Sequence, residues 1–299
     1  MTTPASPTDP IDRRPADDEI DVFGLSHIGL VRKKNQDHFL LASVQKHLHV
    51  LQTNLSEQER VALPDRRLAF IAMVADGVGG GVGGEEASAT TLEVATEYLL
   101  STIDCHDLHN SQSDAFVQAL QDTAMRSHSA VVTRAGGPEA DSKMATTLTL
   151  WLGVWPWYYL LQVGDSRYYL YREKVLTQIT RDQTIAQDLV DQGVFTRAVA
   201  DRSQFANVLS SSIGGHATMP VITRLRADWH NVHLLCTDGL TKHVSDERIA
   251  ECLAGMTSAR QVCEQLLEEA LAGGGSDNIS IIVGRAVPKE GASALPAAT

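Results

Sequence analysis

Basic residues are scarce in this sequence. It holds 25 Lys and Arg against 37 Asp and Glu in 299 residues, which gives a formal net charge of −12. A protein that binds nucleic acid needs a basic face, and an acidic membrane surface attracts basic segments. We therefore expect neither nucleic acid nor membrane among the partners. The acidity favours solubility, and it also leaves open that some carboxylates gather around cations.

Cysteine is rare, and long apolar runs are absent. The cysteines form no C-x-x-C pair and no His/Cys cluster of zinc spacing, so we expect buried free thiols at Cys105, Cys236, Cys252 and Cys263. The first segment, MTTPASPTDPIDRRPADDEI, lacks the apolar region of a signal peptide. No run of about 18 apolar residues occurs. These absences predict a protein of the reducing cytoplasm with no membrane span.

The apolar content of 43% allows the chain to bury a large core. Residues 1–19 contain four prolines and five acidic residues, and few apolar ones, which predicts a disordered N-terminal tail. Residues 288–299 are predicted to be a second disordered tail. No repeat or low-complexity linker divides the segment between them. We therefore predict one domain over residues 20–287.

Short apolar runs bounded by Gly, Asp, Asn or Pro predict strands. They lie at 38–44, 68–75, 147–154, 157–163, 166–171, 231–236 and 279–283. Apolar residues at helical spacing predict helices at about 85–103, 114–134 and 258–271. The order of these elements lacks the regular alternation of a doubly wound sheet. It predicts an α+β fold of antiparallel sheets with helices packed outside them.

Aspartates follow several of the predicted strands directly. Asp76 and Asp238 each come after an apolar run and before a glycine, Asp165 follows another run, and Asp277 precedes the run ISIIV. If these strand ends met, their carboxylates would form the oxygen cage that Mg²⁺ and Mn²⁺ prefer. Each aspartate taken alone is more simply a turn residue, because Asp-Gly is a common turn dipeptide. The glycine-rich stretch GVGGGVGGEE lacks the Lys and Ser/Thr of a phosphate loop, so close packing of a helix start is its expected use.

Six segments follow one another over about residues 20–285: GLSHIGLVRKKNQDHFLLA, VADGVGGGVGGEEAS, MATTLTL, VGDSRYYLYR, LLCTDGLTKHVSDE and GGGSDNISIIV. In this order they resemble the motif set of the metal-dependent type 2C serine/threonine phosphatases, the PPM family, and its bacterial members most closely. The resemblance implies a central antiparallel β-sandwich flanked by helices on both sides. It also implies two Mn²⁺ or Mg²⁺ ions in a cleft at the edge of that sandwich.

The resemblance also implies roles for individual residues. Asp76 is similar to the ligand that bridges both ions, and Gly77 would contribute its carbonyl oxygen. Asp238 and Asp277 would hold the first ion, and Asp37 would serve the second directly or through water. Arg32 resembles the phosphate-binding arginine, although it could equally be a surface residue beside two lysines. Weaker candidates are Asp141, as a ligand of a third ion, and Asp165 and Asn278, which would contact the metal ligands without binding an ion themselves.

The implied activity is hydrolysis of phosphoserine and phosphothreonine in proteins, through attack by a hydroxide that bridges the two metal ions. The implied partners are phosphorylated proteins, namely a Ser/Thr kinase and its substrates, in a signalling role and with the phosphatase as a monomer. Two alternatives remain at this point: an inactive relative that binds phosphoproteins, and a phosphatase for small phosphoesters.

The sequence departs from the family pattern at several positions. Val78 replaces a histidine of some relatives, so water would supply the proton for the leaving group. Lys242 stands where relatives often have an acid, which disfavours a third ion, unless its side chain turns away to Asp246 or Glu247. Residues 181–216 are expected to form a mobile segment over the site, with a short helix near 185–192.

Overall fold

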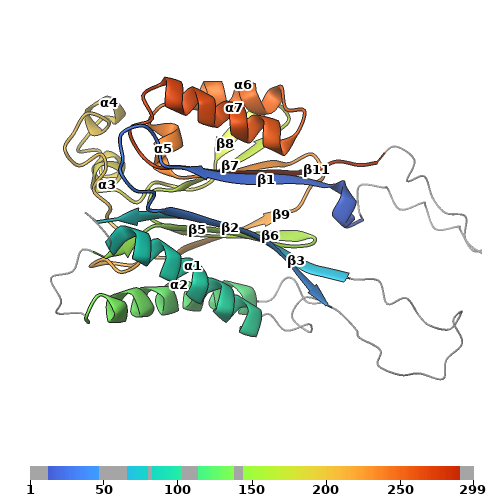
Figure 1. The fold of residues 1–299 in the computed structure, drawn as a ribbon, viewed down its shortest axis with the longest axis horizontal. Helices are drawn as coiled ribbons and strands as arrows, with labels where there is room; N and C mark the ends of the chain where they lie inside the picture. The colour runs from blue at the N-terminus through green and yellow to red at the C-terminus, as the bar shows by residue number, and fades with distance from the viewer. Residues whose placement is uncertain (1–12, 47–65, 80–82, 103–113, 138–143, 290–299) are drawn as a thin grey trace, which may run out of the picture.

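The computed structural model describes residues 13–46, 66–79, 83–102, 114–137 and 144–289. Two antiparallel sheets pack face to face, and helices cover the outer face of each (Figure 1). The first sheet has the order β1 (Ile20–His27), β11 (Ile279–Ala286), β10 (Val232–Cys236), β7 (Arg167–Arg172) and β8 (Val175–Gln178). The second has the order β2 (Asp37–Lys46), β3 (Arg66–Val78), β5 (Leu148–Val154), β6 (Trp157–Val163) and β9 (Val221–Arg226), and β4 (Ala145–Thr146) also pairs with β3. The predicted α+β sandwich is confirmed.

Helices lie on both sides of the sandwich. The long helices α1 (Gly83–Thr102) and α2 (Asp114–Arg134) cover the second sheet, and α6 (Asp246–Ala254) and α7 (Ala259–Ala272) cover the first. The short helices α3 (Ile185–Asp191) and α4 (Arg197–Ala200) lie at one end, near α5 (Asp238–Thr241). None of the helices in the described part of the chain is long and apolar enough to cross a membrane.

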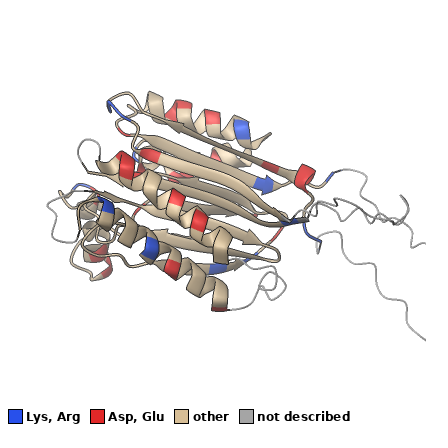
Figure 2. Cartoon of the chain, turned by 60° about the horizontal axis from the view of Figure 1, so that its bottom comes forward, with Lys and Arg blue, Asp and Glu red and all other residues tan. Residues whose placement is uncertain are grey.

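Three apolar cores correspond to the three contacts between the four layers. One lies between α1, α2 and the second sheet, and another between α6, α7 and the first sheet. The third lies between the sheets and includes Val74, Leu160, Tyr168, Leu235 and Ile282. Charged residues lie mostly on the helices and loops, and the strands are largely free of them (Figure 2). This distribution follows from the cost of burying unpaired charge.

Three of the four edge strands were not predicted, whereas the fourth, β2, corresponds to the predicted run at 38–44. The strands β1, β8 and β9 are edge strands, and their side chains are mostly half-buried or exposed, so they show no continuous apolar run. Gly24 interrupts the pattern of β1 for a packing reason: a Cβ there would lie 2.8 Å from the Phe39 ring of the facing sheet. Helix α6 was also missed, and so were the short helices α4 and α5.

The last seven residues of the predicted tail, 13–19, are described and lie against the sandwich. The buried Arg67 donates to the Pro15 carbonyl at 2.6 Å and pairs with Asp17, at the start of the 3₁₀ helix η2 (Asp17–Glu19). The Trp229 indole donates to the Arg13 carbonyl at 2.9 Å. Residues 1–12 and 290–299 lie outside the described residues. The disorder of the tails and the domain limits therefore remain predictions.

The thiols agree with expectation where they are described. Cys236, Cys252 and Cys263 are free and buried. Burial raises the pKa of the Cys236 thiol to about 12, so this group stays protonated and unreactive at neutral pH. Cys105 lies outside the described residues.

Candidate metal centre

The predicted carboxylates meet at one edge of the sandwich because of how the strands pair. Asp37 begins β2 and faces Asp76, near the end of β3, as a cross-strand partner. Strands β10 and β11 are antiparallel neighbours, so Asp238, just after β10, and Asp277, just before β11, lie at the same end. The four aspartates thus come from four different strand ends. Repulsion from neighbouring aspartates adds to burial in raising the pKa values of Asp37 and Asp76.

Asp37 is buried, with 4% of its surface exposed. One carboxylate oxygen, Oδ2, accepts hydrogen bonds from the hydroxyls of Thr237 at 2.8 Å and Ser280 at 2.9 Å. The other oxygen, Oδ1, is buried and has no hydrogen-bond partner among the described residues. Burial, with added repulsion from Asp238 and Asp277, raises the pKa of Asp37 to about 7. The protein thus orients this carboxylate through one oxygen and leaves the other for a cation.

Asp76 is fixed through its backbone. Its N–H donates to the Thr147 hydroxyl at 2.9 Å, and its carbonyl accepts from the Thr146 hydroxyl at 2.8 Å. Burial, followed by the charges of Asp37 and Asp238, raises its pKa well above the ordinary value. Such a carboxylate is stabilised in its ionised form by a nearby cation.

The residue after Asp76 can only be glycine. A Cβ on Gly77 would lie 2.2 Å from the carbonyl oxygen of Gly84, and one on Gly84 would lie 2.4 Å from the side-chain nitrogen of Gln36. The start of α1 therefore packs directly against the strand end that carries Asp76. This confirms close packing of a helix start as the use of the glycine-rich stretch.

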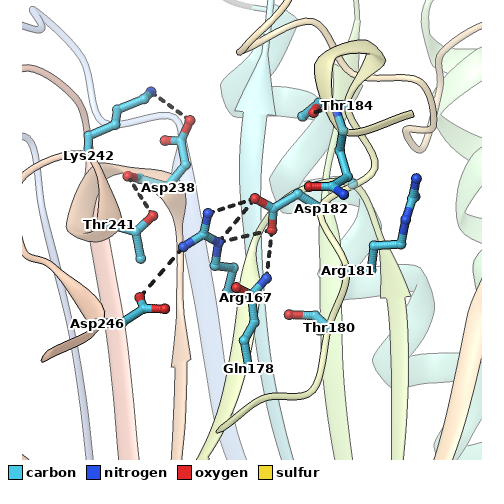
Figure 3. A network of polar contacts seen from close by, with 12 residues as sticks. Arg167, Gln178, Thr180, Arg181, Asp182, Thr184, Asp238, Thr241, Lys242 and Asp246 are labelled. Carbon is cyan, nitrogen blue, oxygen red and sulfur yellow. Dashed lines mark hydrogen bonds and ion pairs between the residues drawn. The ribbon is translucent and has the colours of Figure 1, made fainter. Parts of the chain in front are cut away.

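Asp238 and Asp277 are joined by a lysine. The ammonium Nζ of Lys242 lies 2.6 Å from Oδ2 of Asp238 and 2.7 Å from Oδ2 of Asp277. The contact with Asp238 is visible in Figure 3. Burial raises the pKa of Asp238, although the charge of Lys242 opposes the shift. The other carboxylate oxygen of Asp238, Oδ1, has no partner among the described residues. Burial also acts to raise the pKa of Asp277, but the Lys242 ammonium and the Arg32 guanidinium outweigh it and lower that pKa.

The side chain of Arg32 is half exposed and reaches the carboxylate cluster. Its Nε contacts Oδ1 of Asp277 at 2.8 Å, and its Nη2 donates to Oδ2 of the same residue at 2.8 Å. A guanidinium has five N–H donors, so the remaining donors can face an anion in the adjoining cleft. Arg32 therefore combines an anchor on one predicted metal ligand with further N–H donors beside the cluster.

Asn278 holds the loop that carries Arg32. Its amide nitrogen donates to the carbonyls of Ile28 and Lys34, both at 2.9 Å, and its amide oxygen accepts from the Gln36 N–H at 2.9 Å.

Asp165 lies beside the cluster, where burial, followed by the charges of Asp238 and Asp182, raises its pKa to about 8. Asp141 lies outside the described residues. The roles proposed for all of these residues remain predictions.

The oxygen atoms of this cluster fit a hard cation. Its anionic groups are carboxylates, and burial raises the pKa of three of the four aspartates. Two of the buried carboxylate oxygens have no partner within the described part of the chain. No three acidic, His or Cys side chains of the described segments are already arranged around one metal position. Lys242 and Arg32 instead neutralise the Asp238–Asp277 side.

A cleft opens from the cluster toward the predicted segment over the site. It is lined by Arg32, Asp165, Arg167, Asp238, Lys242 and Asp277, and by residues of α3 and α4 such as Gln187, Arg197 and Ala200. The predicted short helix is confirmed as α3. Arg167 is held in the cleft wall by Asp182, with Nη2 and Oδ2 2.7 Å apart (Figure 3). A second cavity, toward the other ends of the strands, is lined mainly by apolar and aromatic side chains and by no described carboxylate.

Sequence reasoning missed the hydroxyl groups that position the carboxylates. Thr147, Thr237 and Ser280 all lie within segments that were singled out, but no role was assigned to them. The available signal was a polar residue at the end of an apolar strand next to an aspartate. Thr237 directly precedes Asp238, and yet its hydroxyl serves Asp37, 200 residues away in the chain.

Comparisons with known proteins agree with this geometry. Residues 49–273 match the family described as Protein phosphatase 2C. The serine/threonine protein phosphatase PstP of Mycobacterium tuberculosis is 34% identical over 216 residues, which are 72% of this chain and 40% of PstP. The chain therefore spans less than half of that relative. The serine/threonine phosphatase stp of Listeria innocua is 26% identical over 214 residues, 71% of this chain and 83% of stp.

Solved structures show the same architecture. The crystal structure of Mycobacterium tuberculosis PstP has a TM-score of 0.71 at 29% identity and covers 90% of this chain and 99% of that one. A structure of the PstP catalytic domain in complex with two manganese ions has a TM-score of 0.69 at 31% identity, with the same coverage.

Proposed function

The chain belongs to the protein phosphatase 2C family, and from this premise we propose that it is a metal-dependent phosphatase acting on phosphoserine and phosphothreonine in proteins. The observation that carries the proposal is the carboxylate cluster beside Arg32. Aspartates from four strand ends gather at one edge of the sandwich, and two of them, Asp238 and Asp277, line a cleft. Two of the buried carboxylate oxygens have no partner among the described residues, and Arg32 contacts Asp277.

Asp37, Asp76, Asp238 and Asp277, with the Gly77 carbonyl, would hold the ions. We propose two ions, Mn²⁺ or Mg²⁺, because these cations prefer oxygen ligands and because the similar PstP catalytic domain was solved with two manganese ions. When bound, such ions lower the pKa of water and neutralise charge on phosphoryl oxygens. A third ion is disfavoured by the positive charge of Lys242.

The chain's own residues bind and orient the phosphate. A guanidinium can grip two phosphate oxygens at once, so Arg32 would hold the phosphoryl group while Asp277 fixes its direction. Asn278 keeps the Arg32 loop in place through the carbonyls of Ile28 and Lys34. Val78, beside Gly77, has no proton to donate, so we propose that water protonates the leaving hydroxyl.

The substrates would be phosphorylated proteins, including a Ser/Thr kinase and its targets, and the phosphatase would act as a cytoplasmic monomer. The open cleft beneath α3 and α4 suits a peptide segment. A phosphatase for small phosphoesters would not need this extended wall. An inactive phosphoprotein binder would have no need to retain the whole carboxylate cluster.

A metal-dependence assay on a phosphothreonine peptide tests the proposal. We expect turnover with Mn²⁺ or Mg²⁺, none in excess EDTA after dialysis, and a clear preference for the peptide over small metabolite phosphates. Full activity in EDTA would refute the metal requirement, and equal turnover of small phosphoesters would favour the alternative substrate class.

Substitutions test the residue roles. Asp76→Asn should abolish turnover, while the control Asp122→Asn on helix α2 should not. Arg32→Ala should raise KM for the peptide more than it lowers kcat, because it removes phosphate binding. An Asp76→Asn protein that folds and keeps the wild-type rate would contradict the assignment.

A further inference from the structure

The ammonium group of Lys242 lies between two predicted ligands of the same ion. Its distances are 2.6 Å to Asp238 Oδ2 and 2.7 Å to Asp277 Oδ2. The three side chains are only 26%, 18% and 13% exposed, respectively, so the contact is partly shielded from water. This places one positive charge of the chain where two carboxylates converge.

The backbone favours this position. Lys242 is the C-cap of helix α5, four residues after Asp238, which puts both side chains on one face of the helical turn. The Lys242 N–H donates to the Asp238 carbonyl at 2.9 Å, and the Thr241 hydroxyl donates to the same oxygen at 3.3 Å (Figure 3). The alternative predicted from the sequence, pairing with Asp246 or Glu247, is wrong, because the ammonium points into the carboxylate cluster.

We infer that Lys242 is a built-in counter-ion of the Asp238–Asp277 pair, and that a divalent cation binds this pair only by displacing its ammonium group. The inference rests on the proposed metal-dependent function and adds a competitor for one metal position. An ammonium and a metal ion need the same carboxylate oxygens and repel each other. Lys242 therefore stabilises the metal-free fold and weakens cation binding at this position.

Lys242 thus stabilises the metal-free protein and weakens cation binding. This pair of opposite effects distinguishes the inference from two other roles of the lysine. Without Lys242, Asp238 and Asp277 repel each other in the metal-free protein, and only Arg32 remains to offset them. The same removal frees both carboxylates for a cation. A lysine that turned freely into solvent would produce neither effect, and a lysine that supported the ligands would produce weaker cation binding when removed.

The test is a Mn²⁺ titration by calorimetry on metal-free wild type, Lys242→Met and Lys242→Gln. We expect at least tenfold tighter binding at one site in both variants, equivalent to about 1.4 kcal/mol. Thermal unfolding in EDTA should show a lower Tm for both variants than for wild type, and saturating Mn²⁺ should remove or reverse that difference. If Lys242→Met does not fold, the comparison between Lys242→Gln and wild type still tests the inference.

Lys34→Gln is the matched control, because it removes one positive charge from a lysine that pairs with Glu85 at 3.5 Å instead of with the cluster. It should bind Mn²⁺ like wild type. Equal affinities and equal metal-free Tm values in wild type and the Lys242 variants would overturn the inference alone. Weaker Mn²⁺ binding by the variants would overturn it as well. Absence of Mn²⁺ binding by every protein would overturn the proposed function together with the inference.

Discussion

Replacing Thr237 with valine should weaken both the fold and the metal site, although Thr237 binds no ion itself. Its hydroxyl donates to Asp37 Oδ2 at 2.8 Å and accepts from the Ser280 N–H at 2.9 Å, in a fully buried position. Thr237→Val keeps the shape of the side chain and removes both hydrogen bonds. The free oxygen of Asp37, Oδ1, would lose the anchor that directs it.

The magnitude follows from these two contacts. A hydrogen bond to an ionised carboxylate contributes roughly 1.5–3 kcal/mol, and a buried N–H left without an acceptor costs roughly 1–3 kcal/mol. Because Ser280 still donates to Asp37 at 2.9 Å, we expect a combined loss of about 2–4 kcal/mol in the free energy of unfolding. Loss of a group that orients a metal ligand typically lowers metal affinity by roughly 10–100-fold.

The measurement is urea unfolding of the metal-free protein at pH 8, above the pKa of about 7 of Asp37, together with a separate Mn²⁺ titration. Thr237→Ser is the control, because it keeps the hydroxyl and loses only a methyl group. The reasoning would be refuted if Val and Ser variants differed by less than about 0.5 kcal/mol and bound Mn²⁺ equally, since the hydroxyl would then contribute nothing.

Three further predictions follow from burial and close packing. Asp76→Asn should make the metal-free protein more resistant to urea, because it removes a charge that burial penalises, while calorimetry shows weaker Mn²⁺ binding. Gly239→Ala should destabilise the fold by about 1–3 kcal/mol or more in urea, because its Cβ would lie 1.9 Å from the Asn278 carbonyl, whereas Gly255→Ala, with its nearest atom at 3.7 Å, should change little. Burial lowers the pKa of His233 to about 3, below its value of about 6.5 in an unfolded chain, so the stability it contributes is complete above pH 6.5 and is lost as the pH falls toward 3. Unfolding curves of His233→Gln should show a smaller loss over that range than wild type.

Much of the fold was predictable because its central strands are nearly continuous apolar runs. The runs at 68–75, 147–154, 157–163 and 279–283 correspond to β3, β5, β6 and β11. Buried strands must be apolar on both faces, so their signal is strong. The edge strands β1, β8 and β9 were missed because one side of each meets solvent and tolerates polar residues, as the alternating exposure of β8 shows.

The aspartates of the candidate site could also be predicted from the sequence, because a carboxylate directly after a buried strand is a local pattern. Their hydrogen-bond partners could not be predicted. Thr237 serves Asp37 and not its neighbour Asp238, because the hydroxyl crosses from the end of one sheet to the start of a strand in the other. This hydrogen bond depends on how the two sheets pack against each other, so a local sequence pattern cannot predict it.

Lys242 shows the same division most clearly. The sequence by itself determined that a positive charge stands four residues after a predicted metal ligand, and it offered Asp246 and Glu247 as nearby partners. Only the tertiary structure decided that the charge pairs with Asp277, 35 residues away, because antiparallel pairing of β10 with β11 brings the end of one strand to the start of the other. The backbone hydrogen bonds of the sheet fix that register, and the electrostatics of the site follow from it.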